Sequence, residues 1–413
     1  MFLALLGSHL LDDRPYFLVG FLLLLVEWKK VLLREFLAVL VFVASLYIMW
    51  IYIDTWVLNR PDLMLKVLSQ GLLILLMYLL GLSVPLSSQN NDKIFFYFIY
   101  IFIFVYVIML VYSYAIPYIE DYQREEIFFF VDNIVLPLPH EVQPVLKVYG
   151  LKVCFPNEYE RLHVNGGYLI STIIAYYLSI MALLLPMLLF GLKRVKSAKF
   201  TYWEIGIFVL LAIFALYLAN EMGRRTVLVL FAFSFVVSAL IYFSKFIKYR
   251  NTKGVLLAII ALGILGAIAY YFLHDTLAMR KLLSAGLHDK RFSWWGHTVK
   301  IILDYPFGGG HSIYLTPKIY LAHNTWLDIG KDYGVIPFIT FMATTIFFAY
   351  IVLSLLFSNH VSLFLKQLIF LIATALFAIF MIEPVFASDK TFFAYVFFFF
   401  GLLVQLHKKE NKH

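Results

Sequence analysis

Residues 335–357 read VIPFITFMATTIFFAYIVLSLLF, a run without one charged side chain. A helix of about 20 apolar residues can cross the hydrocarbon core of a bilayer, so this run predicts a membrane-spanning helix. The rest of the chain is similar: of its 413 residues 63% are hydrophobic and only 14% are charged, and the mean hydropathy is +0.87. Soluble domains have about 45–50% apolar and about 25% charged residues, so this composition excludes a water-soluble globular protein.

Runs of the same character recur along the whole chain. They cover 37–53, 63–83, 95–113, 168–191, 203–220, 225–243, 255–273, 362–383 and 391–406. The N-terminal segment 2–27 adds one span, or two short spans if Asp12, Asp13 and Arg14 break it into a hairpin. We therefore expect an all-α polytopic membrane protein with about 11–12 transmembrane helices. No internal repeat divides it, so a single domain over residues 1–413 is expected.

The basic residues orient these spans. Lys and Arg number 33 against 25 acidic residues, and they gather in alternate connections, where the positive-inside rule assigns them to the cytoplasm. These connections contain Lys29, Lys30, Arg34, Lys93, and the clusters at 193–199, 245–253 and 408–412. The remaining connections then face outward: 54–62, 114–167, 220–225, 274–334 and 384–390. The net charge of +8 therefore indicates topology, and no nucleic-acid partner is expected.

Two of the outward connections are long. Loop 114–167 mixes acidic residues with apolar runs and prolines, so we expect it to pack on the membrane surface as short helices or a lid. Loop 274–334 contains an amphipathic helix from Arg291 to Leu303, followed by a Pro-Phe-Gly-Gly-Gly turn at 306–310. The glycines allow a positive φ or a close approach of two backbones.

Arg224 and Arg225 lie where one span turns directly into the next, which begins at Thr226. Two guanidinium groups beside the free N–H groups of a helix N-terminus suit an anion such as phosphate. The alternative is that they anchor the span to lipid headgroups. Their external position favours a function, because arginine pairs belong on the cytoplasmic side under the positive-inside rule.

The predicted helix at 291–303 places Arg291, Trp295 and Thr298 on one face. An aromatic ring beside a cation is compatible with a sugar stacked next to a phosphate. The alternative is a surface helix followed by a flexible turn, because the glycines lack the strand and helix of a nucleotide-binding loop.

His323 precedes the span at 335–357, with Asn324 and Asp328 close to it in the sequence. A histidine at the external surface can act as a general base toward a hydroxyl group, although such residues are more often structural. Residue type alone does not select His323, because other histidines are also external: His140, His163, His297 and His311.

Metal chemistry finds no support in the sequence. Cys154 is the single cysteine, which excludes an internal disulfide and a cysteine-based metal cluster. The external acidic residues include Asp304, Asp332, Glu383 and Asp389, and they form neither a DxD nor an HxxxH pattern. We therefore expect no metal and no cofactor.

Together these pieces resemble the O-antigen ligase and Wzy polymerase superfamily. The resemblance rests on Arg224-Arg225-Thr226, on the segment from Arg291 to Trp295, on Asp304 to Gly310, and on His323-Asn324 with Leu327. It covers residues 220–340. Two positions depart from the family pattern: Pro337 replaces a glycine, and Gly223 stands where a serine commonly precedes the arginines.

The resemblance implies a glycosyltransferase at the outer face of the bacterial inner (plasma) membrane. Such enzymes pass a glycan from undecaprenyl pyrophosphate to a sugar hydroxyl, are regarded as metal-independent and inverting, and use arginines for the pyrophosphate. Carried over, Arg224 or Arg225 would bind the pyrophosphate together with Arg291, and His323 would be the base or orient the acceptor. Sugar or acceptor contacts are expected from Trp295, His311, Asn324 and Asp328.

Polymerase and ligase remain alternatives that differ in their acceptor. A polymerase extends another lipid-linked repeat unit of O-antigen, capsule or exopolysaccharide, whereas a ligase transfers the glycan to the lipid A core. The compact stretch from Arg291 to His323 favours the polymerase. Expected partners are the undecaprenyl-pyrophosphate-linked oligosaccharide, the bilayer and a chain-length co-polymerase. A lipid-linked glycan flippase or other transporter is the alternative of another class, but transporters place ionisable groups near the bilayer midplane.

Overall fold

The computed structural model describes most of the C-terminal half and selected segments before it. The described residues are 33–53, 64–84, 86, 127–131, 134–138, 153–154, 163–164, 167–168, 225–248, 291–309, 322–388 and 390–410, with isolated positions between 176 and 216. The predicted spans at 2–27, 95–113 and 255–273 lie outside them, and those at 168–191 and 203–220 are described only at single residues.

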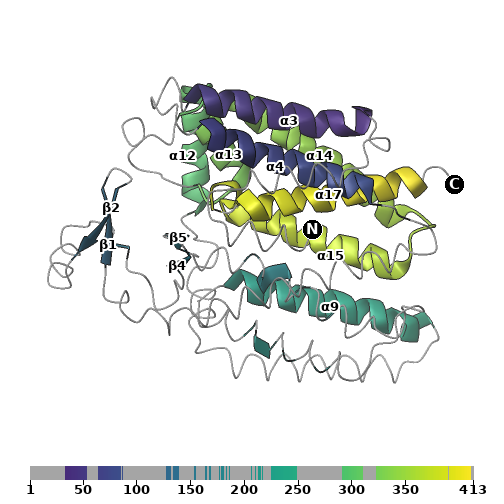
Figure 1. Cartoon of the computed structure of the whole chain (residues 1–413). Coiled ribbons are helices and arrows are strands. Elements are labelled where there is room, and N and C mark those ends of the chain that lie inside the picture. Colours follow the sequence, from purple (N-terminus) through teal and green to yellow (C-terminus); the bar gives the residue numbers. More distant parts are fainter. Residues whose placement is uncertain are drawn as a thin grey trace.

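Long helices form a bundle in which they lie side by side (Figure 1). They are α3 (Leu33–Tyr52), α4 (Met64–Ser83), α9 (Arg225–Lys248), α14 (Val335–Phe357), α15 (Leu363–Ile382) and α17 (Lys390–Glu410). Each coincides with a predicted span. In the described part of the chain, α14, α15 and residues 392–410 of α17 are long and apolar enough to cross a membrane. The prediction of an all-α membrane protein is confirmed for the bundle, with short strands in loop 114–167, while the number of spans remains a prediction.

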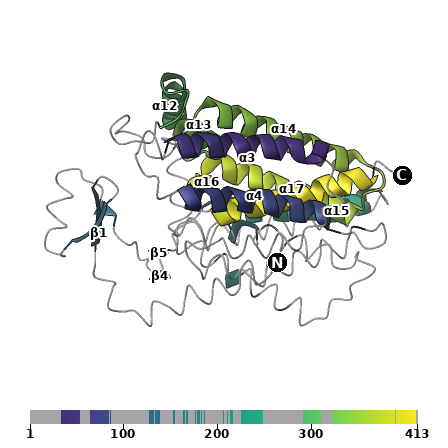
Figure 2. The same ribbon diagram turned by 45° about the horizontal axis from the view of Figure 1, so that its top comes forward.

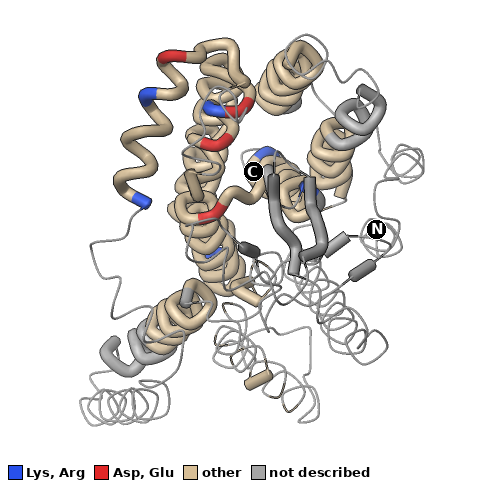
Figure 3. Tube along the Cα trace, turned by 90° about the vertical axis from the view of Figure 1, so that its left-hand side faces the viewer, with Lys and Arg blue, Asp and Glu red and all other residues tan. Residues whose placement is uncertain are grey.

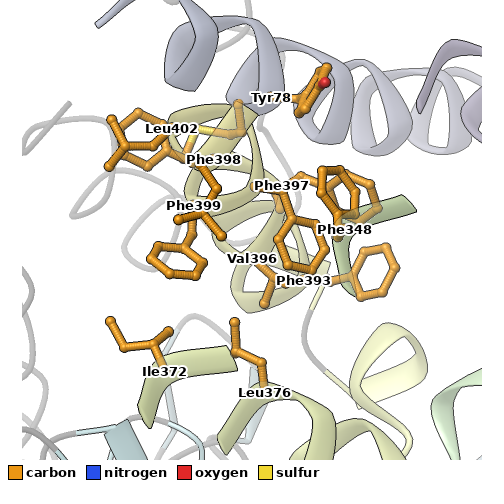
Figure 4. Packing of buried hydrophobic residues seen from close by; sticks show 14 of the residues in the cluster. Tyr78, Phe348, Ile372, Leu376, Phe393, Val396, Phe397, Phe398, Phe399 and Leu402 are labelled. Atoms are coloured by element: carbon orange, nitrogen blue, oxygen red, sulfur yellow. The ribbon is translucent and has the colours of Figure 1, made fainter. Parts of the chain in front are cut away.

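Phenylalanine rings fill the centre of the bundle (Figure 4). Phe42 of α3 stacks on Phe341 of α14 at 4.8 Å and on Phe397 of α17 at 5.8 Å, so one ring joins three helices. Phe348 and Phe400 stack in the same way at 3.8 Å. Such contacts add about 0.5–1.5 kcal/mol per pair to the burial of the rings.

Connections that the sequence assigns to the same side of the membrane lie at the same end of the bundle. At one end Trp50 of α3 packs against Tyr333 and Phe386, which belong to connections predicted to face outward. At the other end the Lys409 ammonium donates to the Leu86 carbonyl at 2.7 Å. The strands, α12 (Arg291–Asp304) and α13 (Thr325–Tyr333) lie at the first end (Figures 1 and 2).

The described residues of loop 114–167 form strands, so the predicted short helices are wrong for these residues, while the alternative of a lid stays a prediction. β1 (Ile127–Val131) pairs antiparallel with β2 (Ile134–Leu138) and with β3 (Val153–Cys154), and a second pair joins β4 (His163–Val164) to β5 (Gly167–Tyr168). The physical reason is local. β1 consists of aromatic and β-branched residues, β2 begins with two β-branched residues, and the two residues between them, Asp132 and Asn133, have the loop length of a tight hairpin.

The glycines after α12 adopt the positive φ that their sequence predicts. Gly308 has a φ of 86° and Gly309 of 82°, and Gly334, at the start of α14, has a φ of 95°. These turns lie against each other, because the Gly309 N–H donates to the Asp332 carbonyl at 2.8 Å and the Val335 N–H donates to the Pro306 carbonyl at 2.8 Å. The glycines therefore lock the end of α12 onto the junction of α13 and α14.

Candidate active site

Helix α12 lies across the end of the bundle, roughly perpendicular to the long helices (Figures 1 and 3). Its inner face is fixed by Thr298 and Ile302, which are buried. The predicted amphipathic helix is therefore confirmed. Figure 3 looks onto this end of the bundle and marks the positions of the charged residues in blue and red.

The short helix α13 begins under α12, and its first turn is capped. The side-chain oxygen of Asn324 accepts from the Leu327 N–H at 3.1 Å, which satisfies one of the free donors of the first turn. The Asn324 amide donates to the Met381 carbonyl at 3.3 Å, near the end of α15. Asn324 therefore ties the start of α13 to α15 and is itself only 5% exposed.

His323 stands immediately before this cap and is held by its neighbours. Its φ is +53°, an uncommon conformation that histidine and asparagine adopt more readily than most residues. The ring of Trp294 stacks on its imidazole, with 5.6 Å between the two ring centroids. The indole N–H of Trp295 donates to the carbonyl of the preceding residue, Ala322, at 3.1 Å. The first turns of α12 thus cover the segment that carries His323.

Glu383 faces the inner edge of the imidazole. Its Oε2 lies 3.8 Å from Nδ1 of His323, which is buried and has no hydrogen-bond partner. The Glu383 backbone is fixed in turn, because the Thr325 hydroxyl donates to its carbonyl at 2.7 Å. The His323 side chain as a whole is 34% exposed and that of Glu383 is 10% exposed. The pair therefore has a buried inner side and an open outer side.

Asp328 lies beneath His323 and is 2% exposed. Its two oxygens accept from the backbone N–H groups of Ala322 at 2.7 Å and of Asn324 at 3.1 Å. The ammonium of the fully buried Lys331 lies 3.8 Å from Asp328 and 3.1 Å from Asp332. Burial raises the pKa of Asp328 from its ordinary 3.8 to about 6, although Lys331 opposes the shift.

The structure brings several of the predicted site residues together. Arg291 opens α12, is partly buried and precedes Trp295 by one turn, about 6 Å along the helix axis. Trp295, His323, Asn324 and Asp328 are thus brought together, while the approach of the Arg291 guanidinium to His323 stays a prediction. Arg225 is the first residue of α9, and its side chain is not described. Arg224 and His311 lie outside the described residues. Their convergence with His323 stays a prediction.

Two residues of this site were not predicted from the sequence, namely Trp294 and Glu383. The helical spacing of Arg291 and Trp295 drew attention to Trp295, but Trp294 is the ring on the imidazole. Glu383 lies 60 positions after His323, and only the packing of α13 against the end of α15 joins them. Its signal in the sequence is a lone carboxylate at the external end of an apolar span. Among the described residues no cluster of three or more His, Cys, Asp or Glu could hold a metal ion.

These features define a class: a polytopic helical membrane protein with a histidine–carboxylate pair and two tryptophans at one end of its bundle. Residues 207–342 match the model of the O-antigen ligase family, Wzy_C. This match confirms the resemblance to the O-antigen ligase and Wzy polymerase superfamily over a stretch that includes α9, α12, α13 and the site residues from Arg224 to Asp328.

The family match indicates a membrane enzyme of the glycosyl-transfer type in general, and it applies to polymerases and ligases alike. Glu383 lies beyond the matched residues, so its place beside His323 is a finding of the structure. No curated protein matches the chain in sequence.

Proposed function

We propose that this protein polymerises oligosaccharide repeat units linked to undecaprenyl pyrophosphate, at the outer face of the bacterial inner membrane. The observation that carries the proposal is the pair of His323 and Glu383 at one end of the bundle, in which His323 belongs to the stretch that matches the O-antigen ligase family. The alternative of a ligase that transfers the glycan to lipid A core uses the same chemistry with another acceptor.

The acceptor hydroxyl is a poor nucleophile, so its proton must leave as the new bond forms. Nδ1 of His323 faces Glu383 in the interior, which leaves Nε2, on the opposite edge of the ring, for the hydroxyl. The hydroxyl oxygen attacks the anomeric carbon from the side opposite the leaving group, while its proton moves to Nε2. General-base catalysis of this kind contributes about 10²–10⁴ in rate.

Glu383 stabilises the imidazolium that this proton transfer creates. Its distance of 3.8 Å from Nδ1 is longer than a hydrogen bond, and catalytic hydrogen bonds often tighten only when substrate is bound. The stacked ring of Trp294 restricts the orientation of the imidazole. The indole N–H of the neighbouring Trp295 donates to the backbone carbonyl of Ala322, which precedes His323. The protein thus supports both the position and the charge of the base.

The leaving group is a lipid pyrophosphate, which gains negative charge as the bond from the anomeric carbon to oxygen breaks. Guanidinium groups suit this charge because they form paired hydrogen bonds to phosphate oxygens and remain protonated. Arg291 belongs to the first turn of α12, which also carries Trp294, and Arg225 opens α9, where a helix N-terminus suits an anion. In our proposal these two residues take the place that a metal ion has in other transferases.

Reconstitution tests the proposal. The purified protein is placed in liposomes with undecaprenyl-pyrophosphate repeat units, with and without lipid A core, and with and without a chelator. We expect a ladder of glycan chains that needs no core and is insensitive to the chelator. Transfer only to the core would indicate the ligase, and loss of the ladder with the chelator would contradict the metal-independent mechanism. Movement of intact repeat units across the bilayer without a new glycosidic bond would indicate the transporter.

A further inference from the structure

One acidic side chain holds the backbone on both sides of His323. The Asp328 carboxylate accepts the N–H of Ala322 with one oxygen and the N–H of Asn324 with the other. We call these three groups the Asp328 clamp. Between its two bonds lies His323, whose φ of +53° turns the chain sharply. The clamp therefore fixes the conformation of the residue that carries the imidazole.

We propose that Asp328 is a positioning residue of the transfer reaction, which holds the imidazole of His323 between Trp294 and Glu383 through the backbone. This inference rests on the proposed function and adds a residue that acts without touching the substrate. At 2% exposure, with both oxygens bonded inside the protein, Asp328 has no surface left for a sugar. The sequence predicted a substrate contact here, and the geometry points to a different role.

A carboxylate is the side chain that this geometry requires. Two backbone N–H groups converge on it, and each needs an acceptor because both are buried. Asparagine has one oxygen and one NH₂ group, so it can accept only one of the two and turns a donor toward the other. The Asp328→Asn variant therefore breaks half of the clamp while it keeps the size and shape of the side chain.

The charge of Asp328 carries a free-energy cost because the side chain is buried. Burying a carboxylate is unfavourable, and the raised pKa of Asp328 reflects that cost. The fully buried Lys331 supplies a counter-charge at 3.8 Å, and Lys331 also contacts Asp332 at 3.1 Å. Replacing a whole buried ion pair by well-packed apolar residues is often neutral or stabilising, whereas removing one partner leaves the other charge uncompensated. The effect of a substitution at Asp328 on activity therefore has to be compared with its effect on stability.

Asp332 provides a matched control. It lies on the same helix, contacts the same Lys331 and has the same charge, but no bond joins it to the backbone around His323. Its own backbone carbonyl accepts from the Gly309 N–H, which the substitution of its side chain leaves in place. Asp332→Asn and Asp328→Asn thus remove the same charge near Lys331, and only the second opens the clamp.

The experiment measures chain formation, melting temperature and amide hydrogen exchange for the full-length protein and the two variants in liposomes. We expect Asp328→Asn to lower kcat about 10- to 100-fold with little change in KM for the lipid-linked donor, because a small displacement of a catalytic group has this effect. Its melting temperature should match that of Asp332→Asn, whose kcat should stay near wild type. Amide exchange at residues 322–324 should rise in Asp328→Asn alone.

Two results would overturn the inference. One is an equal loss of activity in both variants that follows their melting temperatures, because this indicates a structural role. The other is unchanged exchange at residues 322–324 in Asp328→Asn. If the wild-type protein forms no chains, the proposed function fails, and the exchange measurement still decides whether the clamp exists.

Discussion

The single imidazole of His323 depends on contacts from three separate parts of the chain. Trp294 of α12 covers its face, Glu383 after α15 faces its Nδ1, and Asp328 of α13 bonds the backbone around it. The sequence indicated His323 as a candidate base, and it indicated that Asn324 and Asp328 are near. It could not indicate Glu383, because α14 and α15 separate it from His323 in the chain, and the meeting of the two segments is a property of the packed bundle.

The pKa of Asp328 leads to a pH dependence of stability. Its value is about 6 in the folded protein against an ordinary 3.8, so the folded state binds this proton more tightly than the unfolded state. Ionisation between these values therefore lowers the free energy of unfolding as the pH rises. We predict that the melting temperature of wild type, relative to Asp328→Asn, falls between about pH 4 and about pH 6 and then levels off. A difference between the two proteins that grows over this range would contradict the assignment.

At the scale of elements, two helices approach so closely that only glycine fits between them. A Cβ on Gly81 of α4 would overlap the Phe398 carbonyl of α17, and a Cβ on Gly401 of α17 would overlap the Tyr78 carbonyl of α4. Small residues permit such close packing of membrane helices, where van der Waals contact drives association. The periodicity of the spans predicted both helices, but it could not predict that they would be direct neighbours.

This contact predicts opposite effects for two glycine substitutions. Gly81→Ala should lower the stability of the bundle by about 1–3 kcal/mol, because the backbones must separate. Gly296→Ala on α12 is the control, since a Cβ there meets no atom within 4 Å and alanine is the better helix former. Thermal unfolding in detergent measures both. Equal melting temperatures for Gly81→Ala and wild type would show that α4 and α17 are not packed in this way.

The strands of loop 114–167 show where interpretation of the pattern fails at this scale. Mixed apolar and acidic residues in a membrane loop favour short surface helices or a lid, whereas its described residues form β1 to β5. The helix α12 could be predicted, because its residues alternate between a buried face and an exposed one with the spacing of a helix. Long elements with a regular period can be predicted, whereas strands of two to five residues depend on their partners.

For the whole molecule, the charges of the connections predict which end of the bundle faces outward. The structure separates the end with α12 and α13 from the end with Lys409, as the alternation of basic connections requires. We predict that, in a Cys154→Ser background, Lys300→Cys on α12 reacts with a membrane-impermeant maleimide in spheroplasts. Glu410→Cys at the end of α17 should react only after the membrane is opened. The reverse pattern would place the candidate site in the cytoplasm and exclude the proposed donor.

The central claim is that arginines bind the diphosphate of the donor while the imidazole of His323 performs the proton transfer at the same site. Binding of undecaprenyl pyrophosphate to the purified protein tests it most directly, with Arg225→Ala, Arg291→Ala and His323→Asn compared with wild type. Asparagine suits the backbone at position 323, because it also tolerates a positive φ. We predict that both arginine variants lose binding at least about tenfold and that His323→Asn binds like wild type but forms no chains. Wild-type binding in both arginine variants, or chain formation by His323→Asn, would contradict the account.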